Sequence, residues 1–184
     1  MHGPSVKPPQ PEGIWQIVYS GDQWATSEGE DRYRRGLYTY WRRTSPYPSM
    51  ITFDAPSREV CTVRRIRTNT PLQALVTLND PVYVEAAQAM AQRIMEEAPA
   101  DDVNARVDYA YLLATSRPPS EAERTQVAAL YVDELNRYGQ DGEAALAMAT
   151  APLADPPSDE EAAELASWTV VSNVLLNLDE VLTK

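Results

Sequence analysis

The sequence predicts a mainly α fold, an irregular helical array with an extended proline-rich N-terminal arm and a long ordered arginine-rich loop. Helix-start signals recur after residue 70, and apolar residues follow each of them at helical spacing. No run alternates with the period of two that a half-buried strand would show. With 184 residues, of which 43% are hydrophobic, the chain can bury a core and differs from a disordered one.

Residues 1–30 are predicted to form an extended arm and a loop, and residues 31–184 a helical domain. Pro4, Pro8, Pro9 and Pro11 favour an extended arm, which the apolar stretch 14–19 is expected to dock onto the body. Apolar side chains at helical spacing then predict a helix over 31–43, which the segment Ser45-Pro46-Tyr47-Pro48 would end. Residues 49–69 show no sustained period, so we expect an ordered but irregular segment, a kind that is often functional.

The helices after residue 70 follow from their caps. Thr70, Pro71 and Gln73 form a capping-box pattern, and the helix they begin is expected to bury an apolar face. Asp80 and Pro81 begin a second helix over about 81–97. The predicted inner faces are Leu72, Leu75, Val76 and Leu78 in the first helix, and Val84, Ala87, Met90, Ala91 and Ile94 in the second.

A third helix is expected to begin at Asp101 or Asp102, and a fourth follows the capping box of Ser120 and Glu123 and ends with Gly139 as its C′ residue. A short helix near 142–150 and a proline-rich linker over 152–157 come next. A last capping box, at 158–161, begins a helix that extends to about residue 177. The predicted inner faces of the third, fourth and last helices are Val103, Val107, Ala110, Tyr111 and Ala114; Val127, Leu130, Tyr131, Leu135 and Tyr138; and Ala162, Leu165, Ala166, Trp168, Thr169, Ser172, Leu175 and Leu176.

Composition excludes several classes of function. The single Cys and the single His, at position 2, leave no disulfide framework, Cys-rich cluster, His-based metal site or Ser-His-Asp triad. No phosphate loop or dinucleotide fingerprint is present, and no apolar run approaches the roughly 20 residues of a membrane span. The first residues lack the features of a signal peptide. We therefore expect no metal and no cofactor in this chain.

The net charge of −11 is unevenly distributed. Residues 81–184 carry 19 acids against six bases, whereas the window 32–67 holds nine arginines and two acids. The arginine-rich segment either packs against the acidic half of the molecule or binds an anion in bidentate fashion. The overall charge repels a polyanion, so nucleic acid is not an expected partner.

The candidate site lies within this arginine-rich segment. Asp54 and Glu59 could perform acid–base chemistry as a carboxylate pair, or they could pair with neighbouring arginines and hold the segment in one conformation. Cys61 is either a thiolate favoured by nearby cations or a small buried hydrophobe. The residues proposed to hold an anionic or hydroxyl-rich ligand are Asp54, Arg58, Glu59, Arg64, Arg65, Arg67 and Asn69.

Several long motifs resemble one family. They include the segment RTNTPLQAL at 67–75 and the segment LATSRPP at 113–119. Further matching segments are Gly3–Pro8, Tyr33–Thr44, Thr52–Arg65, Leu78–Pro81 and Trp168–Glu180. Together they make the chain similar to the C-terminal part of the planctomycete-type domain of unknown function 1553.

The resemblance implies a large exported protein, periplasmic or at the cell surface, in which a second domain of unknown function and often a cytochrome c-like module precede this domain. Haem c would then belong only to the separate cytochrome module, because no Cys-x-x-Cys-His motif is present. The expected partners are the upstream part of the same domain or that module, and the chain is expected to be truncated or a fragment.

Two functional hypotheses follow. The first is a non-catalytic binding or assembly module that holds an anionic or glycan ligand at the arginine-rich loop. The second is a fragment of an extracytoplasmic enzyme that acts on complex polysaccharide or in haem-linked redox chemistry.

Overall fold

The computed structural model describes residues 3–15, 21, 23–64, 68–99, 102–150 and 157–183, without the side chains of 159 and 160. The chain divides by its internal contacts into two compact units, each of which is described by itself below. The N-terminal unit comprises residues 1–76 and 80–82, and the helical unit comprises residues 77–79 and 83–184. The division into 1–30 and 31–184 stays a prediction.

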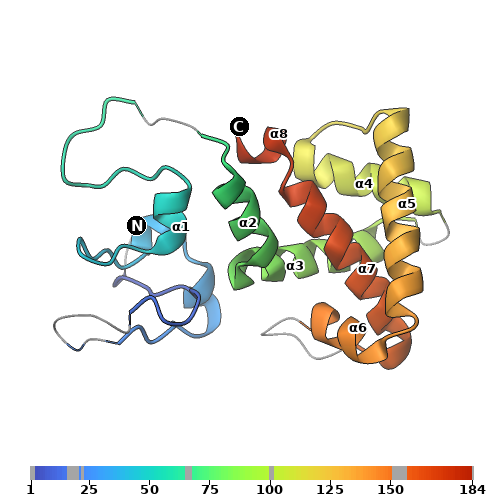
Figure 1. Cartoon of the computed structure of the whole chain (residues 1–184), viewed down its shortest axis with the longest axis horizontal. Coiled ribbons are helices and arrows are strands. Elements are labelled where there is room, and N and C mark those ends of the chain that lie inside the picture. The colour runs from blue at the N-terminus through green and yellow to red at the C-terminus, as the bar shows by residue number, and fades with distance from the viewer. Residues whose placement is uncertain are drawn as a thin grey trace. The chain divides into compact units, whose positions relative to one another are not determined.

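The fold is mainly α, as the sequence predicts (Figure 1). Its one β feature within the described residues is an isolated parallel bridge between Val6 and Thr39. No helix of the described chain is long and apolar enough to cross a membrane. The helices are α1 (Pro48–Thr52), α2 (Pro71–Asn79), α3 (Pro81–Glu97), α4 (Val103–Thr115), α5 (Glu121–Tyr138), α6 (Gly142–Ala149), α7 (Asp159–Leu176) and α8 (Asp179–Leu182), with short 3₁₀ helices at Gly29–Tyr33 and Gly36–Tyr38.

The helical unit is organised around α7, which packs against α4, α5 and α6 (Figure 1). Trp168 of α7 is fully buried and stacks on Tyr131 of α5 with a ring-centroid distance of 4.5 Å. Most of the predicted inner-face positions lie in this core. The buried side chains of the core as a whole are Met90, Ala91, Ile94, Val107, Ala110, Tyr111, Val127, Tyr131, Tyr138, Ala145, Ala149, Ala162, Leu165, Ala166, Trp168, Val171 and Leu175.

Most of the predicted helix starts are confirmed. Two of the three predicted capping boxes, at Thr70 and at Ser120, have the hydroxyl accepting from the N3 backbone amide and the N3 side chain accepting from the backbone amide of the cap residue. The carboxylate of Asp80 accepts from the Val82 amide at 2.9 Å, and that of Asp102 accepts from the Asn104 amide at 2.8 Å. These bonds satisfy donors that a helix N-terminus leaves without intrahelical partners.

Two predicted helix ends lie at the expected residues, but their capping contacts differ from the prediction. The Ser158 hydroxyl donates to the Glu161 carboxylate at 2.7 Å, and its oxygen accepts from no backbone amide of the helix. Gly139 follows α5 in right-handed helical conformation, with φ of −64°, so it is not a left-handed C′ residue. The predicted linker lies almost wholly in 151–156, outside the described residues.

The predicted helix over 31–43 is also wrong. Two short 3₁₀ helices occupy part of this range, and the chain then extends so that Tyr38 and Tyr40 pair with Val6. A backbone that donates and accepts across this bridge cannot continue a helical ladder. Pro48, predicted to end a helix, instead occupies the first position of α1.

The predicted apolar face of α2 does not lie in the core. Leu72 is 58% exposed and Leu75 is 59% exposed, and Leu78 is exposed as well. The buried side chains of this helix are Gln73 and Thr77. Each is held by hydrogen bonds, since Gln73 donates to the Thr52 carbonyl and Thr77 bonds to the amide oxygen of Asn177 at 2.6 Å. Apolar periodicity therefore predicted the wrong face.

Candidate functional site in the N-terminal unit

The N-terminal arm is fixed by hydrogen bonds from the residues it crosses. The Val6 amide donates to the Tyr38 carbonyl, and the Val6 carbonyl accepts from Tyr40, both at 2.8 Å. Lys7 is bonded to Ser27 in both directions, from its amide to the hydroxyl and from the Ser27 amide to its carbonyl. Proline residues lack a backbone donor, so the rest of the arm must be held through its carbonyl oxygens.

Four aromatic side chains gather beneath the arm. The ring centroids of Trp15 and Trp24 are 5.1 Å apart, those of Trp24 and Tyr47 are 5.9 Å apart, and those of Trp15 and Tyr40 are 6.1 Å apart. Trp15 and Tyr47 are buried. This cluster supplies to the N-terminal unit the apolar packing that its short helices do not provide.

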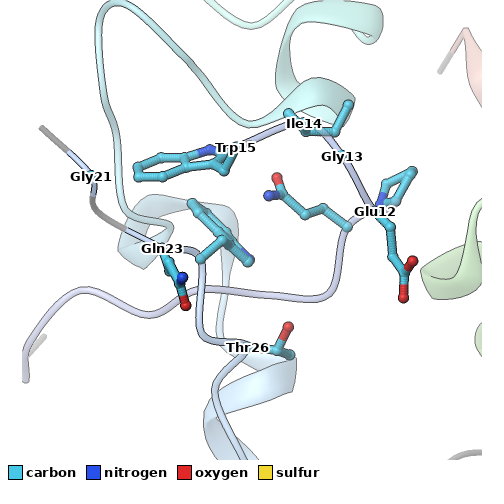
Figure 2. A pocket seen from close by; sticks show the side chains of 10 residues that line it. Glu12, Gly13, Ile14, Trp15, Gly21, Gln23 and Thr26 are labelled. Carbon is cyan, nitrogen blue, oxygen red and sulfur yellow. The ribbon is translucent and has the colours of Figure 1, made fainter. Parts of the chain in front are cut away.

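A pocket of about 540 Å³ opens beside this cluster, within the size range of small-molecule sites. Figure 2 shows the Trp15 ring along one side, Thr26 across from it, and the Glu12 carboxylate pointing away from the ring. Indole faces, amide groups and a hydroxyl therefore surround one hollow. The pocket is lined by Gln10, Pro11, Glu12, Gly13, Ile14, Trp15, Gly21, Gln23, Trp24 and Thr26.

Two buried polar atoms on residues that line this pocket lack a hydrogen-bond partner. The indole nitrogen of Trp15 is a donor with no acceptor, and the side-chain oxygen of Gln10 is an acceptor with no donor. Trp15 is 8% exposed, so its N–H group is also largely cut off from solvent. Buried polar groups are nearly always paired, because an unpaired one costs about 1–3 kcal/mol. The residues that line this pocket therefore include two polar atoms whose hydrogen-bonding capacity is unused in this structure.

Sequence reasoning did not find this pocket. It predicted that residues 14–19 dock the arm, which fits the buried Trp15, whereas 16–20 lie outside the described residues. It assigned residues 1–30, which include Trp24, to an arm and a loop, and it placed no ligand-binding residue there. The signal that was missed is the pair Trp15 and Trp24, whose side chains lie together beside the pocket although they are separated in sequence.

Among the predicted site residues, Asp54 has described contacts with Thr68 and Gln73. Asp54 accepts from both the amide and the hydroxyl of Thr68 at 2.8 Å, and its carboxylate is 3.5 Å from the Gln73 amide nitrogen. Asp54 also adopts a left-handed backbone, with φ of 57°. These bonds close the loop between residues 54 and 68.

The arginines of this segment lie mostly at the surface. Arg58 stacks on Trp41, with its guanidinium carbon 4.7 Å from the ring centroid. Glu59 forms an exposed ion pair with Arg43 at 3.8 Å, and Arg64 and Asn69 are exposed. Arg65 and Arg67 lie outside the described residues. A ligand-binding role for this set stays a prediction.

Cys61 is exposed, so it does not act as a small buried hydrophobe. Asp54 and Glu59 have different partners, Thr68 and Arg43 respectively. Within the described residues, no three His, Cys, Asp or Glu side chains come together as a potential metal site.

Another recognisable motif, at 113–119, has a structural explanation. Arg117 bonds both carboxylate oxygens of Glu123, at 2.7 and 3.0 Å, and both of Glu180, at 2.6 and 3.0 Å. Its guanidinium also lies over the Tyr111 ring. Arg117 thereby joins α4, α5 and α8 within the helical unit, and bonds from Arg117 and from Ser120 lower the pKa of Glu123 to about 2.

The fold and the pocket define a mainly α chain whose arm and aromatic cluster enclose a small polar hollow. A family model described as "Protein of unknown function (DUF1553)" matches residues 1–131. The chain therefore belongs to this family, and the matched range contains the N-terminal unit, α3, α4 and most of α5. No curated protein and no solved structure matches the chain.

Proposed function

We propose that the chain is a non-catalytic binding module and that its N-terminal unit holds a sugar residue of a glycan in the pocket beside Trp15. The observation that carries this proposal is the unpaired donor of Trp15 together with the unpaired acceptor of Gln10. A sugar hydroxyl accepts one hydrogen bond and donates another, so a ligand bearing several hydroxyls can satisfy both atoms.

The remaining lining agrees with the same chemistry. The indoles of Trp15 and Trp24 offer apolar surface, while Gln23 and Thr26 offer an amide and a hydroxyl. Sites for small ligands commonly combine such aromatic walls with a few polar groups that fix orientation. No strongly charged group is required to neutralise a hydroxyl-rich ligand, which fits a pocket whose one carboxylate, Glu12, points away from Trp15.

The arginine-rich segment extends this proposal to acidic glycans. The guanidinium carbon of Arg42 is 5.2 Å from the Trp15 ring centroid, and Arg58 and Arg64 are exposed. Guanidinium groups recognise sulfate and carboxylate groups in bidentate fashion. A glycan with anionic substituents would therefore bind more tightly than its neutral counterpart and would lose this advantage in salt.

We also propose the setting that the family resemblance implies. The chain would belong to a larger exported protein, with the upstream part of the domain or a cytochrome c-like module as its partner. A glycan-binding module suits such a protein because glycans are abundant outside the cytoplasm, and any haem would stay in the partner module.

Calorimetric titration of the chain with neutral and sulfated oligosaccharides tests the proposal. The variant Trp15→Phe keeps an aromatic ring and removes the N–H donor, so we expect binding to weaken about fivefold to tenfold. The matched control is Trp41→Phe, the same change at a tryptophan that does not line the pocket.

Equal loss of affinity in the two variants, or no binding of any oligosaccharide by the wild-type chain, would overturn the proposal. Release of new reducing ends from a polysaccharide by the purified chain would favour the enzymatic alternative.

A further inference from the structure

The arm presents its backbone to the N-terminal unit as a bound peptide does. The Pro8 carbonyl accepts from the Trp24 indole N–H at 2.9 Å, and the Pro9 carbonyl accepts from the Tyr47 hydroxyl at 2.6 Å. Together with Val6 and Lys7, these residues give four successive positions whose carbonyl oxygens are all bonded. Aromatic residues that donate to successive carbonyls are the means by which proteins bind extended proline-rich peptides.

The lysine before the two prolines supplies sequence selectivity. Its ammonium group lies 5.6 Å from the Tyr40 ring centroid, 5.9 Å from that of Trp24 and 6.0 Å from that of Trp15. The same ammonium donates to the Gln23 carbonyl at 3.2 Å. Three rings around one cation favour Lys or Arg over a neutral residue at this position.

The hydroxyl that holds Pro9 is a permanent donor. Burial raises the pKa of Tyr47 to about 12, and the nearby Asp80 carboxylate contributes to this rise. Tyr47 is therefore protonated at physiological pH. It can donate this hydrogen bond to a proline carbonyl of its own arm or to one of another chain.

None of these hydrogen bonds depends on the link between the arm and the rest of its own chain. The described hydrogen-bond partners of residues 4–9 lie between Gln23 and Tyr47, whereas the link runs through Pro11 and the turn at Glu12–Trp15. Gly13 in this turn has a φ of 89°, which a residue with a side chain rarely adopts. A change of backbone at this glycine would redirect the arm and leave its binding surface unchanged.

We propose that this aromatic surface, formed by Trp15, Trp24, Tyr40 and Tyr47, is a recognition site for an extended Val-Lys-Pro-Pro peptide, and that a second copy of the chain supplies this peptide by exchanging its arm. The exchanged arm makes the same contacts as the arm described here, because those contacts belong to residues 6–9. Exchange of an identical element is a low-cost route to a dimer. This inference does not rest on the proposed glycan ligand, but its hinge, Gly13, also lines the pocket proposed for that ligand.

Two full-length variants with complementary defects test the exchange. Val6→Asp places a charge at a position that is 2% exposed, so it disables the arm and leaves the aromatic surface intact. Trp24→Phe combined with Tyr47→Phe removes both donors from the surface and leaves the arm intact. Each variant is labelled at Cys61, the chain's one cysteine, with either a fluorescence donor or an acceptor.

We expect energy transfer in the mixture of the two variants that exceeds the transfer within either variant alone. An excess of a synthetic peptide of residues 3–11 should abolish it. The same peptide, carrying a fluorophore, should bind the Val6→Asp variant, and the added change Tyr47→Phe should weaken this binding about fivefold.

A mixture without energy transfer in which the peptide still binds would overturn the assignment to a second copy. Failure of the peptide to bind both the wild-type chain and Val6→Asp, with helical circular dichroism retained, would overturn the recognition site itself. Should Val6→Asp fail to fold, competition between labelled peptide and the wild-type arm decides the same question. Saturable binding supports the site, and its absence contradicts it.

Discussion

In the helical unit, large apolar side chains meet in one core, and helix caps join residues two or three positions apart. In the N-terminal unit, polar side chains bond backbone atoms far away in sequence, as Trp24 bonds Pro8 and Tyr47 bonds Pro9. The first arrangement depends on non-directional burial, the second on the geometry of single hydrogen bonds. Loss of a single hydrogen-bonding atom should therefore reduce stability more in the N-terminal unit. Loss of side-chain volume should reduce stability more in the helical unit.

The largest effect is expected at Trp168. The variant Trp168→Ala empties a fully buried position that is stacked on Tyr131, which should cost about 3–5 kcal/mol of unfolding free energy. Urea unfolding followed by far-ultraviolet circular dichroism measures the loss. Val174→Ala, at an exposed position of the same helix, is the control and should change little.

The second largest loss of stability is expected in the N-terminal unit, at Gln73. Gln73→Ala removes the donor to the Thr52 carbonyl and the acceptor for the Thr70 amide, so we expect a loss of about 2–3 kcal/mol. In a Trp168→Phe background the remaining tryptophans all belong to the N-terminal unit, so their fluorescence reports its unfolding. Leu72→Ala, at the exposed neighbouring residue, should be nearly neutral, and equal losses in the two variants would contradict this account of α2.

A smaller effect separates two serines with the same sequence pattern. Ser120→Ala removes a hydroxyl that accepts from the Glu123 amide, which should cost about 1 kcal/mol. Ser158→Ala removes a hydroxyl that caps no backbone amide, so its cost should stay within about 0.5 kcal/mol. The two thermal midpoints, measured side by side, should differ, and identical shifts would show that Ser158 caps its helix after all.

The smallest effect concerns the ion pairs of Arg117. Bonds from Arg117, and then from Ser120, lower the pKa of Glu123 from 4.5 to about 2. A carboxyl whose pKa is lower in the folded chain stabilises the fold above pH 4.5 and loses this contribution as the pH falls towards 2.

Unfolding free energy should thus fall more steeply with acidification in the wild-type chain than in Glu123→Gln. Because the pair is partly exposed, about 0.5 M salt should reduce the difference between them. Parallel pH profiles at low salt would contradict the assignment.

The two units also differ in how well their structure could be predicted from the sequence. The helices of the helical unit were predictable because their caps and apolar spacing are local signals, as at Asp102 and Ser120. The helix over 31–43 was predicted wrongly because Tyr38 and Tyr40 pair with Val6, which no local pattern reveals. The exposure of Leu72 has the same origin, since hydrogen bonds of Gln73 decide which face of α2 is buried.

The pocket beside Trp15 was not predicted from the sequence, and a ligand-binding role for the predicted arginine-rich residues stays a prediction. The sequence pointed to an irregular, arginine-rich and aromatic region, and the pocket does lie within the N-terminal unit. Charge density suggested Asp54 as a ligand-binding group, although its carboxylate is engaged by Thr68. Gln10 and Trp15 belong to no recognisable sequence motif. Their unpaired buried atoms are seen only in the three-dimensional structure.

The stacking of Tyr131 on Trp168 has a consequence for gene design. The range shared with the family ends at residue 131, inside α5, while the indole that covers this tyrosine is encoded 37 codons downstream. An open reading frame trimmed to the shared range would yield a polypeptide with α7 missing and the apolar faces of α4 and α5 open to solvent. Such a product would be prone to aggregate in the expression host. The range matched by the family model is therefore shorter than the segment that is needed to complete the core.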